Sequence, residues 1–130
     1  MTYFEREFNR IKALIFANEE QIQTIVNVRN YIDNNYEKEL NLDKLSRVQF
    51  VSKYHLLRLF KRYYGITPRQ YLIQKRIEKA KAFLKSGTSV SDTCYAVGFE
   101  SIHSFSNLFK EKTGMSPSVF RRATFDKSNP

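Results

Sequence analysis

The sequence predicts an all-α protein, and three features of the chain support that fold class. Glycine and proline are scarce, with four and three among 130 residues. Apolar residues recur three or four positions apart, as on one face of an amphipathic helix, and the alternation typical of a half-buried strand is nearly absent. The third feature is an internal repeat with a period of 49 residues. Hydrophobic residues make up 42% of the chain, enough for a folded core.

The N-terminal segment, residues 1–19, is predicted to be an amphipathic helix that ends near Asn18. One face of it carries four apolar side chains at helical spacing: Phe4, Phe8, Ile11 and Ile15. A second helix is expected from about residue 20 to residue 36. Two interpretations of residues 1–19 remain open: a helix that caps the first subdomain, or an arm that forms a homodimer or binds another partner.

Capping residues predict the boundaries of the remaining helices. Serine and threonine cap helix starts, proline is favoured at the first helical position, and glycine ends helices. The expected helices cover about 42–48, 53–63, 68–85, 89–97, 101–112 and 117–123. The helix from residue 68 is the longest. Residues 124–130 are expected to form a flexible tail.

The repeat relates two copies of one helical pattern. Nine residues return unchanged 49 positions later: Asp43, Val48, Phe50, Ser52, Leu59, Phe60, Lys61, Gly65 and Pro68 match Asp92, Val97, Phe99, Ser101, Leu108, Phe109, Lys110, Gly114 and Pro117. Each copy is a short helix, a tight turn, a second helix led by serine, and a closing Gly-x-[Ser/Thr]-Pro. This order is that of a helix-turn-helix, whose second helix enters the major groove of DNA. The predicted organisation is therefore an N-terminal helix or arm (1–19), a first helix-turn-helix subdomain (20–66), a linker helix (67–87), a second subdomain (88–123) and the tail (124–130).

The charge of the chain favours a polyanionic partner. The net charge is +9, and residues 1–40 hold five basic and seven acidic side chains, so the excess lies in the rest of the chain. Such a protein usually binds nucleic acid, or less often an anionic membrane. A single cysteine excludes an internal disulfide framework, and no apolar run predicts a signal peptide or a transmembrane helix. Secreted, membrane-spanning and large-enzyme classes are therefore disfavoured.

The second helix of each copy has one face for packing and one for DNA. Residues 56, 59 and 60, and residues 105, 108 and 109, are expected to point inward. On the other face, Arg58 can form a bidentate pair with guanine and Asn107 with adenine. The basic side chains of Lys53, Lys61, Arg62, Lys110 and Lys112 suit phosphates, as do the amides that follow Ser52 and Ser101.

Leu42–Arg122 resembles the DNA-binding domain of the AraC/XylS family of bacterial transcription regulators. The first copy carries the resemblance in Ser52-Lys53-Tyr54-His55-Leu56-Leu57-Arg58-Leu59-Phe60-Lys61 and Gly65-Ile66-Thr67-Pro68, and the second in Ala96-Val97-Gly98-Phe99-Glu100-Ser101 and Gly114-Met115-Ser116-Pro117. The resemblance implies a homeodomain-like fold of seven helices, promoter binding by both copies, activation through RNA polymerase, and a place in the bacterial cytoplasm on the nucleoid. By position, the implied base contacts are Tyr54, Leu57 and Arg58 in the first copy, and Ile102, His103, Ser106 and Asn107 in the second.

The chain departs from the family pattern at particular positions. Many members have arginine where Asn107 stands, so the second copy is expected to contact a different base. Leu57 stands at a position that is often polar, which suggests contact with a thymine methyl group. Only about 40 residues precede the motif, fewer than the usual effector-binding domain. The chain therefore resembles the short stand-alone members, or the DNA-binding half of a longer effector-sensing regulator.

Rival functions depend mainly on Cys94, which stands at the repeat position of Leu45. We expect a small buried side chain there, and the alternative is a small Cys94-dependent enzyme on the same fold. A third interpretation is a protein-interaction module. His55 and His103 have no cysteine or carboxylate at ligand spacing, so neither a metal site nor a cofactor is expected.

Overall fold

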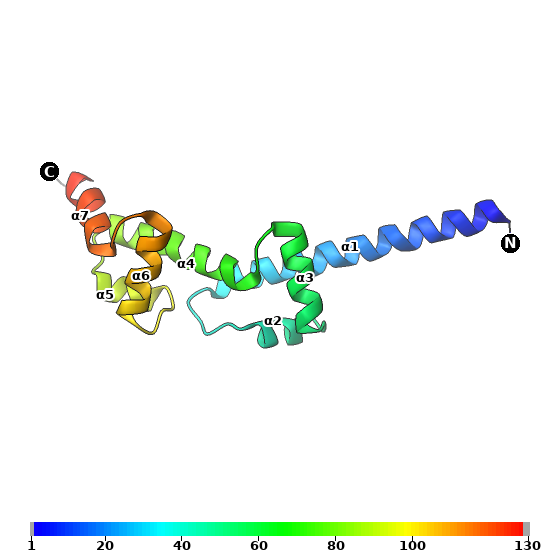
Figure 1. Cartoon of the computed structure of the whole chain (residues 1–130), viewed down its shortest axis with the longest axis horizontal. Coiled ribbons are helices and arrows are strands. Elements are labelled where there is room, and N and C mark those ends of the chain that lie inside the picture. Colours follow the sequence, from blue (N-terminus) through cyan, green and yellow to red (C-terminus); the bar gives the residue numbers. More distant parts are fainter. Residues whose placement is uncertain (1, 129–130) are drawn as a thin grey trace. The chain divides into compact units, whose positions relative to one another are not determined.

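The computed structural model describes residues 2–128, which form seven α-helices and no strand (Figure 1). The helices are α1 (Tyr3–Asn35), α2 (Leu42–Val48), α3 (Lys53–Tyr64), α4 (Pro68–Lys85), α5 (Val90–Ala96), α6 (Ile102–Thr113) and α7 (Pro117–Ser128). The predicted all-α class is confirmed. None of these helices is long and apolar enough to cross a membrane.

The helices group into two compact units. The first holds the chain up to Ile32 and Asn41–Pro68, and the second holds Asp33–Leu40 and the chain from Arg69 onward. Each helix-turn-helix pair, α2 with α3 and α5 with α6, therefore lies inside one unit. Apart from Pro68, α4 belongs to the second unit.

The first unit buries one face of α3 together with the last third of α1. Its fully or almost fully buried apolar side chains are Ile25, Val28, Ile32, Leu45, Leu56, Leu59 and Phe60. The rings of Phe60 and Tyr64 lie 4.8 Å apart, and the guanidinium of Arg29 lies over the Tyr64 ring. These contacts hold α3 against α1.

The second unit has a core of aromatic side chains. Ile77, Ala80, Leu84, Cys94, Val97, Phe105 and Phe109 are buried together. Ring contacts run from Phe99 to Phe105, from Phe105 to Phe109 and from Phe109 to Phe120, with centroids 5.3–5.7 Å apart. This row of rings connects the turn before α6 with α7. It therefore packs α6 against the preceding turn through Phe105 and against α7 through Phe109.

The segment that follows α1 is held to α4 and to the second helix-turn-helix. Arg76 donates from Nε to the Tyr36 carbonyl at 2.6 Å and from Nη2 to the Lys38 carbonyl at 2.8 Å. Burial lowers the pKa of Arg76, and the neighbouring positive charge of Arg69 acts in the same direction. One turn earlier on α4, the Tyr71 hydroxyl donates to Asp33 Oδ1 at 2.7 Å. These bonds explain why Asp33–Leu40 belongs to the second unit.

The predicted break at Asn18 is wrong, because α1 runs without interruption from Tyr3 to Asn35. One asparagine lowers helix stability by only a few tenths of a kcal/mol to about 0.7 kcal/mol, and good helix formers such as Glu19 and Glu20 follow it. No residue from Thr2 to Glu20 is buried. This exposure gives no support to the interpretation of residues 1–19 as a cap on the first subdomain.

The last helix is longer than predicted, since α7 continues to Ser128 instead of ending near Ala123. Contacts with the second unit explain the extension. A Cβ atom at Gly87 would lie 2.6 Å from the Phe125 ring, and the Arg121 guanidinium lies 5.2 Å from the centre of that ring. Of the expected tail, residues 129–130 lie outside the described part of the chain.

The repeat has two periods rather than one. The helices α3 and α6 match at 49 residues, but α2 and α5 match at 48, because the first turn is one residue shorter. Equivalent hydrogen bonds show the register: Phe50 donates to the Arg47 carbonyl as Gly98 donates to the Tyr95 carbonyl, both at 3.2 Å. The predicted matches of Asp43 with Asp92, Val48 with Val97 and Phe50 with Phe99 are therefore wrong, and Cys94 corresponds to Ser46 rather than Leu45.

Phe50 occupies the left-handed position that Gly98 occupies in the second copy. Its φ is 56°, the only positive φ among the described non-glycine residues, and its side chain is 96% exposed. An L-residue with a Cβ atom costs roughly 1–2 kcal/mol in this region. The first turn is therefore strained, and no contact with the rest of the chain compensates by burying the ring.

We predict that Phe50→Gly raises the free energy of unfolding by about 1 kcal/mol, because glycine removes the left-handed strain. Chemical denaturation measures the change. The control is Phe50→Ala, which deletes the ring but keeps the Cβ atom and should leave stability nearly unchanged. If Phe50→Ala stabilised the fold as much as Phe50→Gly, the exposed ring and not the left-handed backbone would be the cause of the lower stability.

We predict that Gly98→Ala destabilises the fold by about 3 kcal/mol and Gly114→Ala by about 1 kcal/mol. Both glycines have positive φ, at 101° and 83°. A Cβ atom at Gly98 would meet the Glu37 carbonyl oxygen at 2.9 Å, whereas one at Gly114 meets nothing within 4 Å. Denaturant unfolding of both variants checks this difference. Equal losses would contradict a close backbone contact at Gly98.

Candidate nucleic-acid interface

The helices α3 and α6 are bounded by the same capping interactions. Ser52 Oγ accepts a hydrogen bond from the His55 amide at 3.1 Å, and Ser101 Oγ accepts one from the Ser104 amide at 3.3 Å. Each helix ends at a glycine, Gly65 or Gly114, whose amide donates to a carbonyl one turn back at 2.8 Å. The two helices therefore have equal length, and the predicted caps are confirmed in both copies.

The packing face of each helix is almost as predicted. Leu56, Phe60, Phe105 and Phe109 have no exposed surface, and Leu59 retains 5%. Leu108 is only half-buried, so the second copy buries fewer side chains of this helix than predicted. In each helix the buried residues fix one face against the core of its unit. Because of the helical period, residues on the opposite face of the same helix must then point outward.

The predicted base contacts of the first copy lie along the outer face of α3. Tyr54 is 67% exposed, Arg58 is exposed and Leu57 is half-buried. Tyr54 and Arg58 are one turn apart, so a groove that admits the helix would meet both side chains. The Lys53 ammonium lies over the Tyr54 ring, 5.5 Å from its centre, and 3.7 Å from the Asp43 carboxylate on α2.

The predicted base contacts of the second copy lie on α6 in the same way. Ile102, His103 and Asn107 are exposed and Ser106 is half-buried. Asn107 Nδ2 lies 3.2 Å from His103 Nε2, so the imidazole and the amide form a joint polar surface. Sequence spacing of i and i+4 predicts the contact, although that pair was not singled out from the sequence.

The side chains assigned to phosphates lie toward the ends of the helices. Lys61 and Arg62 are exposed in the last turn of α3, and Lys110 and Lys112 in the last turn of α6. Cations there also stabilise the negative end of the helix dipole, so their position serves the fold as well as a polyanion. Ser52 and Ser101 use their hydroxyls as caps, which leaves backbone amides of the first turn as the groups that suit a phosphate.

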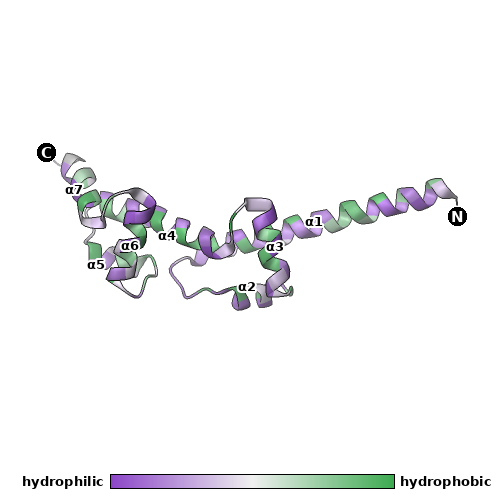
Figure 2. Cartoon of the chain, viewed as in Figure 1, coloured by the Kyte–Doolittle hydropathy of each residue, from purple (hydrophilic) through white to green (hydrophobic). Residues whose placement is uncertain are grey.

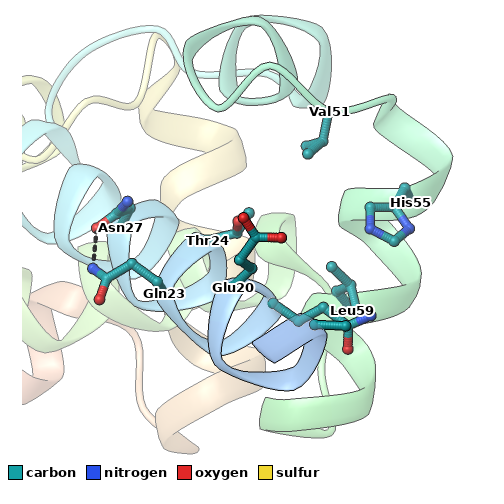
Figure 3. A pocket seen from close by; sticks show the side chains of 9 residues that line it. Glu20, Gln23, Thr24, Asn27, Val51, His55 and Leu59 are labelled. Atoms are coloured by element: carbon teal, nitrogen blue, oxygen red, sulfur yellow. Dashed lines mark hydrogen bonds between the residues drawn. The ribbon is translucent and has the colours of Figure 1, made fainter. Parts of the chain in front are cut away.

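A hollow of about 460 Å³ lies between α3 and α1 (Figure 3). His55 and Leu59 line it from α3, and Glu20 and Thr24 line it from α1. His55 is half-buried here and lines the hollow together with Leu59, a residue of the packing face. It therefore lies at the edge of the packing face of α3.

A second hollow, of about 590 Å³, lies at the start of α6 and was not predicted. Ser101 and Ser104 line it from the α6 end, and Arg69 and Arg76 line it from α4. Glu37, Glu39 and Glu100 also line it, so acidic groups offset the two guanidinium groups. Arg69 is exposed and becomes a further candidate for a phosphate contact near the start of α6.

Cys94 is buried in the core of the second unit. The side chain has no exposed surface, and Sγ donates weakly to the Phe99 carbonyl at 3.9 Å. Burial raises the pKa of the Cys94 thiol above its usual value, so the reactive thiolate is disfavoured. Among residues 2–128, no three His, Cys, Asp or Glu side chains form a group that could hold a metal ion.

The comparisons with known proteins agree with this geometry. The family described as "Helix-turn-helix domain" matches residues 45–123. AdaA of Bacillus subtilis, a "bifunctional transcriptional activator/DNA repair enzyme", is 36% identical over 96 residues, which are 73% of this chain and 46% of AdaA. AarP of Providencia stuartii, an "HTH-type transcriptional activator", is 31% identical over 102 residues, covering 78% of this chain and 76% of AarP.

A solved structure also shares the fold. The C-terminal domain of AraT, a response regulator from Geobacillus stearothermophilus, superposes with a TM-score of 0.74 at 29% identity. The match covers 77% of this chain and 84% of that domain. By contrast, the chain spans less than half the length of AdaA.

We predict that native Cys94 reacts with iodoacetamide more than about 100-fold more slowly than the unfolded chain, since alkylation must wait for opening of the core. The raised pKa has a second consequence: the stabilising contribution of the protonated thiol is complete below the ordinary thiol pKa and is lost as pH rises through the raised one. Rapid alkylation of the folded protein at neutral pH would contradict the burial and support the rival Cys94-dependent enzyme.

Proposed function

Because the chain belongs to the AraC-type helix-turn-helix family of transcription regulators, we propose that it binds double-stranded DNA through both α3 and α6 and regulates transcription. Each helix enters a segment of the major groove, N-terminus first. Tyr54, Leu57 and Arg58 contact bases in one segment. Ile102, His103, Ser106 and Asn107 contact bases in the other.

One observation carries the proposal. Two helices of equal length, with equivalent caps and two matching buried positions each, present exposed polar side chains that are chemically different. Arg58 offers a donor fork that fits guanine O6 and N7, and Asn107 offers a donor and an acceptor that fit adenine N6 and N7. A duplicated scaffold with different polar faces is suited to a bipartite DNA sequence and has no advantage for nonspecific binding.

Basic side chains supply the sequence-independent part of the binding. Lys61, Arg62, Lys110 and Lys112 contact phosphates, together with Lys53 and the first-turn amides of α3 and α6. The chain carries nine more positive than negative side chains, which favours association with DNA over a wide range of sequences. Base contacts then select the site.

The regulatory outcome is activation, exerted through contact with RNA polymerase in the bacterial cytoplasm. The names of AdaA and AarP call those proteins activators, which supports the same direction here. The chain is not an enzyme in this proposal, because the only cysteine is buried and its thiolate is disfavoured.

We predict that selection from a random duplex library yields two conserved blocks about one helical turn apart, near 10–10.5 base pairs centre to centre. Arg58→Ala should abolish the preference at one base of the first block and weaken the selected site by about 1–3 kcal/mol. Asn107→Ala should do the same in the second block. Lys61→Ala is the matched control: it should weaken selected and random duplexes alike and lower the salt slope by about one.

The variants separate base contacts from charge. If Arg58→Ala weakened selected and random DNA equally, Arg58 would be a phosphate contact and the assignment of base contacts would be wrong. If Asn107→Ala left both blocks unchanged, only the first copy would contribute sequence specificity.

A further inference from the structure

The first half of α1 exposes a row of large apolar side chains. Phe4 is 77% and Phe8 is 54% exposed, and Ile11, Ile15 and Ile22 are each about half exposed. Figure 2 shows green apolar patches that recur along this part of α1. Helices in proteins gain most of their stability from packing of an apolar face, and contiguous exposed apolar surface of this kind marks an interaction site.

The spacing of the row indicates what covers it. Its positions 4, 8, 11, 15, 18 and 22 alternate steps of four and three residues, which is the heptad pattern of a coiled coil. We refer to these six positions as the α1 seam. A second α-helix lying alongside at a small crossing angle would contact every one of them, whereas a flat or irregular partner would not require this periodicity.

The charge of this part of α1 excludes nucleic acid and anionic membranes as partners of the seam. From Thr2 to Ile22 the helix has three basic side chains (Arg6, Arg10, Lys12) and four acidic ones (Glu5, Glu7, Glu19, Glu20). Nucleic acid and anionic lipid both require a basic surface, which this segment lacks. A neutral helix with both signs of charge is suited to another neutral helix, and a second copy of this chain provides one.

We propose that the α1 seam forms a parallel, in-register two-helix coiled coil with a second copy of the chain. In this register, Glu7 flanks the seam next to the partner's Lys12, and the pairing occurs twice by symmetry. Both side chains already lie at the edge of the seam. The Lys12 ammonium lies over the Phe8 ring, 5.4 Å from its centre, and Glu7 is held at 2.9 Å by Arg10 of its own helix.

Asn18 determines the orientation. It is the only polar residue on the seam, and in the parallel register it meets the partner's Asn18, so the two amides hydrogen-bond to each other. The antiparallel arrangement that uses all six positions, with Phe4 opposite the partner's Ile22, places each Asn18 against the partner's Phe8, where its amide has no polar partner. Only the parallel register pairs the two Asn18 side chains with each other.

The seam ends where the first unit begins. Ile25 continues the heptad spacing, but it is 2% exposed because it packs in the core of its own unit. The two helices must therefore separate after Ile22. If the proposed function holds, two DNA-binding units then emerge from the same end of the coiled coil, and the dimer favours two copies of its site related by a two-fold axis.

We predict that analytical ultracentrifugation of the full chain without DNA gives twice the monomer mass. Phe8→Glu should weaken the dimer by at least tenfold, because it places a charge in a buried layer. The matched control is Phe16→Glu, the same substitution at a 61% exposed phenylalanine of α1 that lies off the seam, and it should leave the dimer intact. A monomeric wild type, or equal losses in both variants, would overturn the proposal.

Cross-linking tests the orientation. In the parallel register Ile15 faces the partner's Ile15, so Ile15→Cys should give a disulfide-linked dimer on mild oxidation, while Phe16→Cys should not. Native Cys94 is buried and does not interfere. A wild-type dimer without this cross-link would overturn the parallel register. These measurements contain no DNA, so they fail or succeed independently of the proposed function.

Discussion

The burial of one face of α3 and of one face of α6 is the constraint on which the rest of this structure depends. Leu56 and Phe60 on α3, and Phe105 and Phe109 on α6, have no exposed surface. Once these side chains are fixed in a core, the helical period determines which positions face outward. Arg58 and Asn107 are exposed for that reason, and their chemistry is free to vary without disturbing the fold. The scaffold is shared by both copies, and in the proposed function the exposed positions supply the sequence specificity.

The two copies achieve the same scaffold by different local means. In the second, Gly98 adopts a left-handed conformation and lets the backbone approach Glu37, while Arg76 binds the carbonyls of Tyr36 and Lys38. In the first, Phe50 adopts the left-handed conformation at an energetic cost, with its ring exposed. The tightly packed turn of the second copy also secures the segment after α1, a role that the first copy lacks.

Sequence reasoning predicted the elements that depend on local chemistry. Ser52, Ser101, Gly65 and Gly114 bound α3 and α6 because capping needs only neighbouring residues. The shorter first turn was missed, because identical residues such as Phe50 and Phe99 matched at one period although their backbones are not equivalent. Continuity of α1 and the length of α7 depend on weak propensities and on contacts such as Phe125 with Gly87, which spacing alone does not show. The contact between His103 and Asn107 became evident only from the positions of their side chains.

The central claim is that both α3 and α6 enter the major groove, and chemical-modification interference at N7 of guanine and adenine measures this most directly, because both atoms lie in the major groove. On a selected duplex, the account predicts interference in two clusters about one helical turn apart on one face of the DNA. A single cluster, or no interference despite salt-sensitive binding, would contradict it.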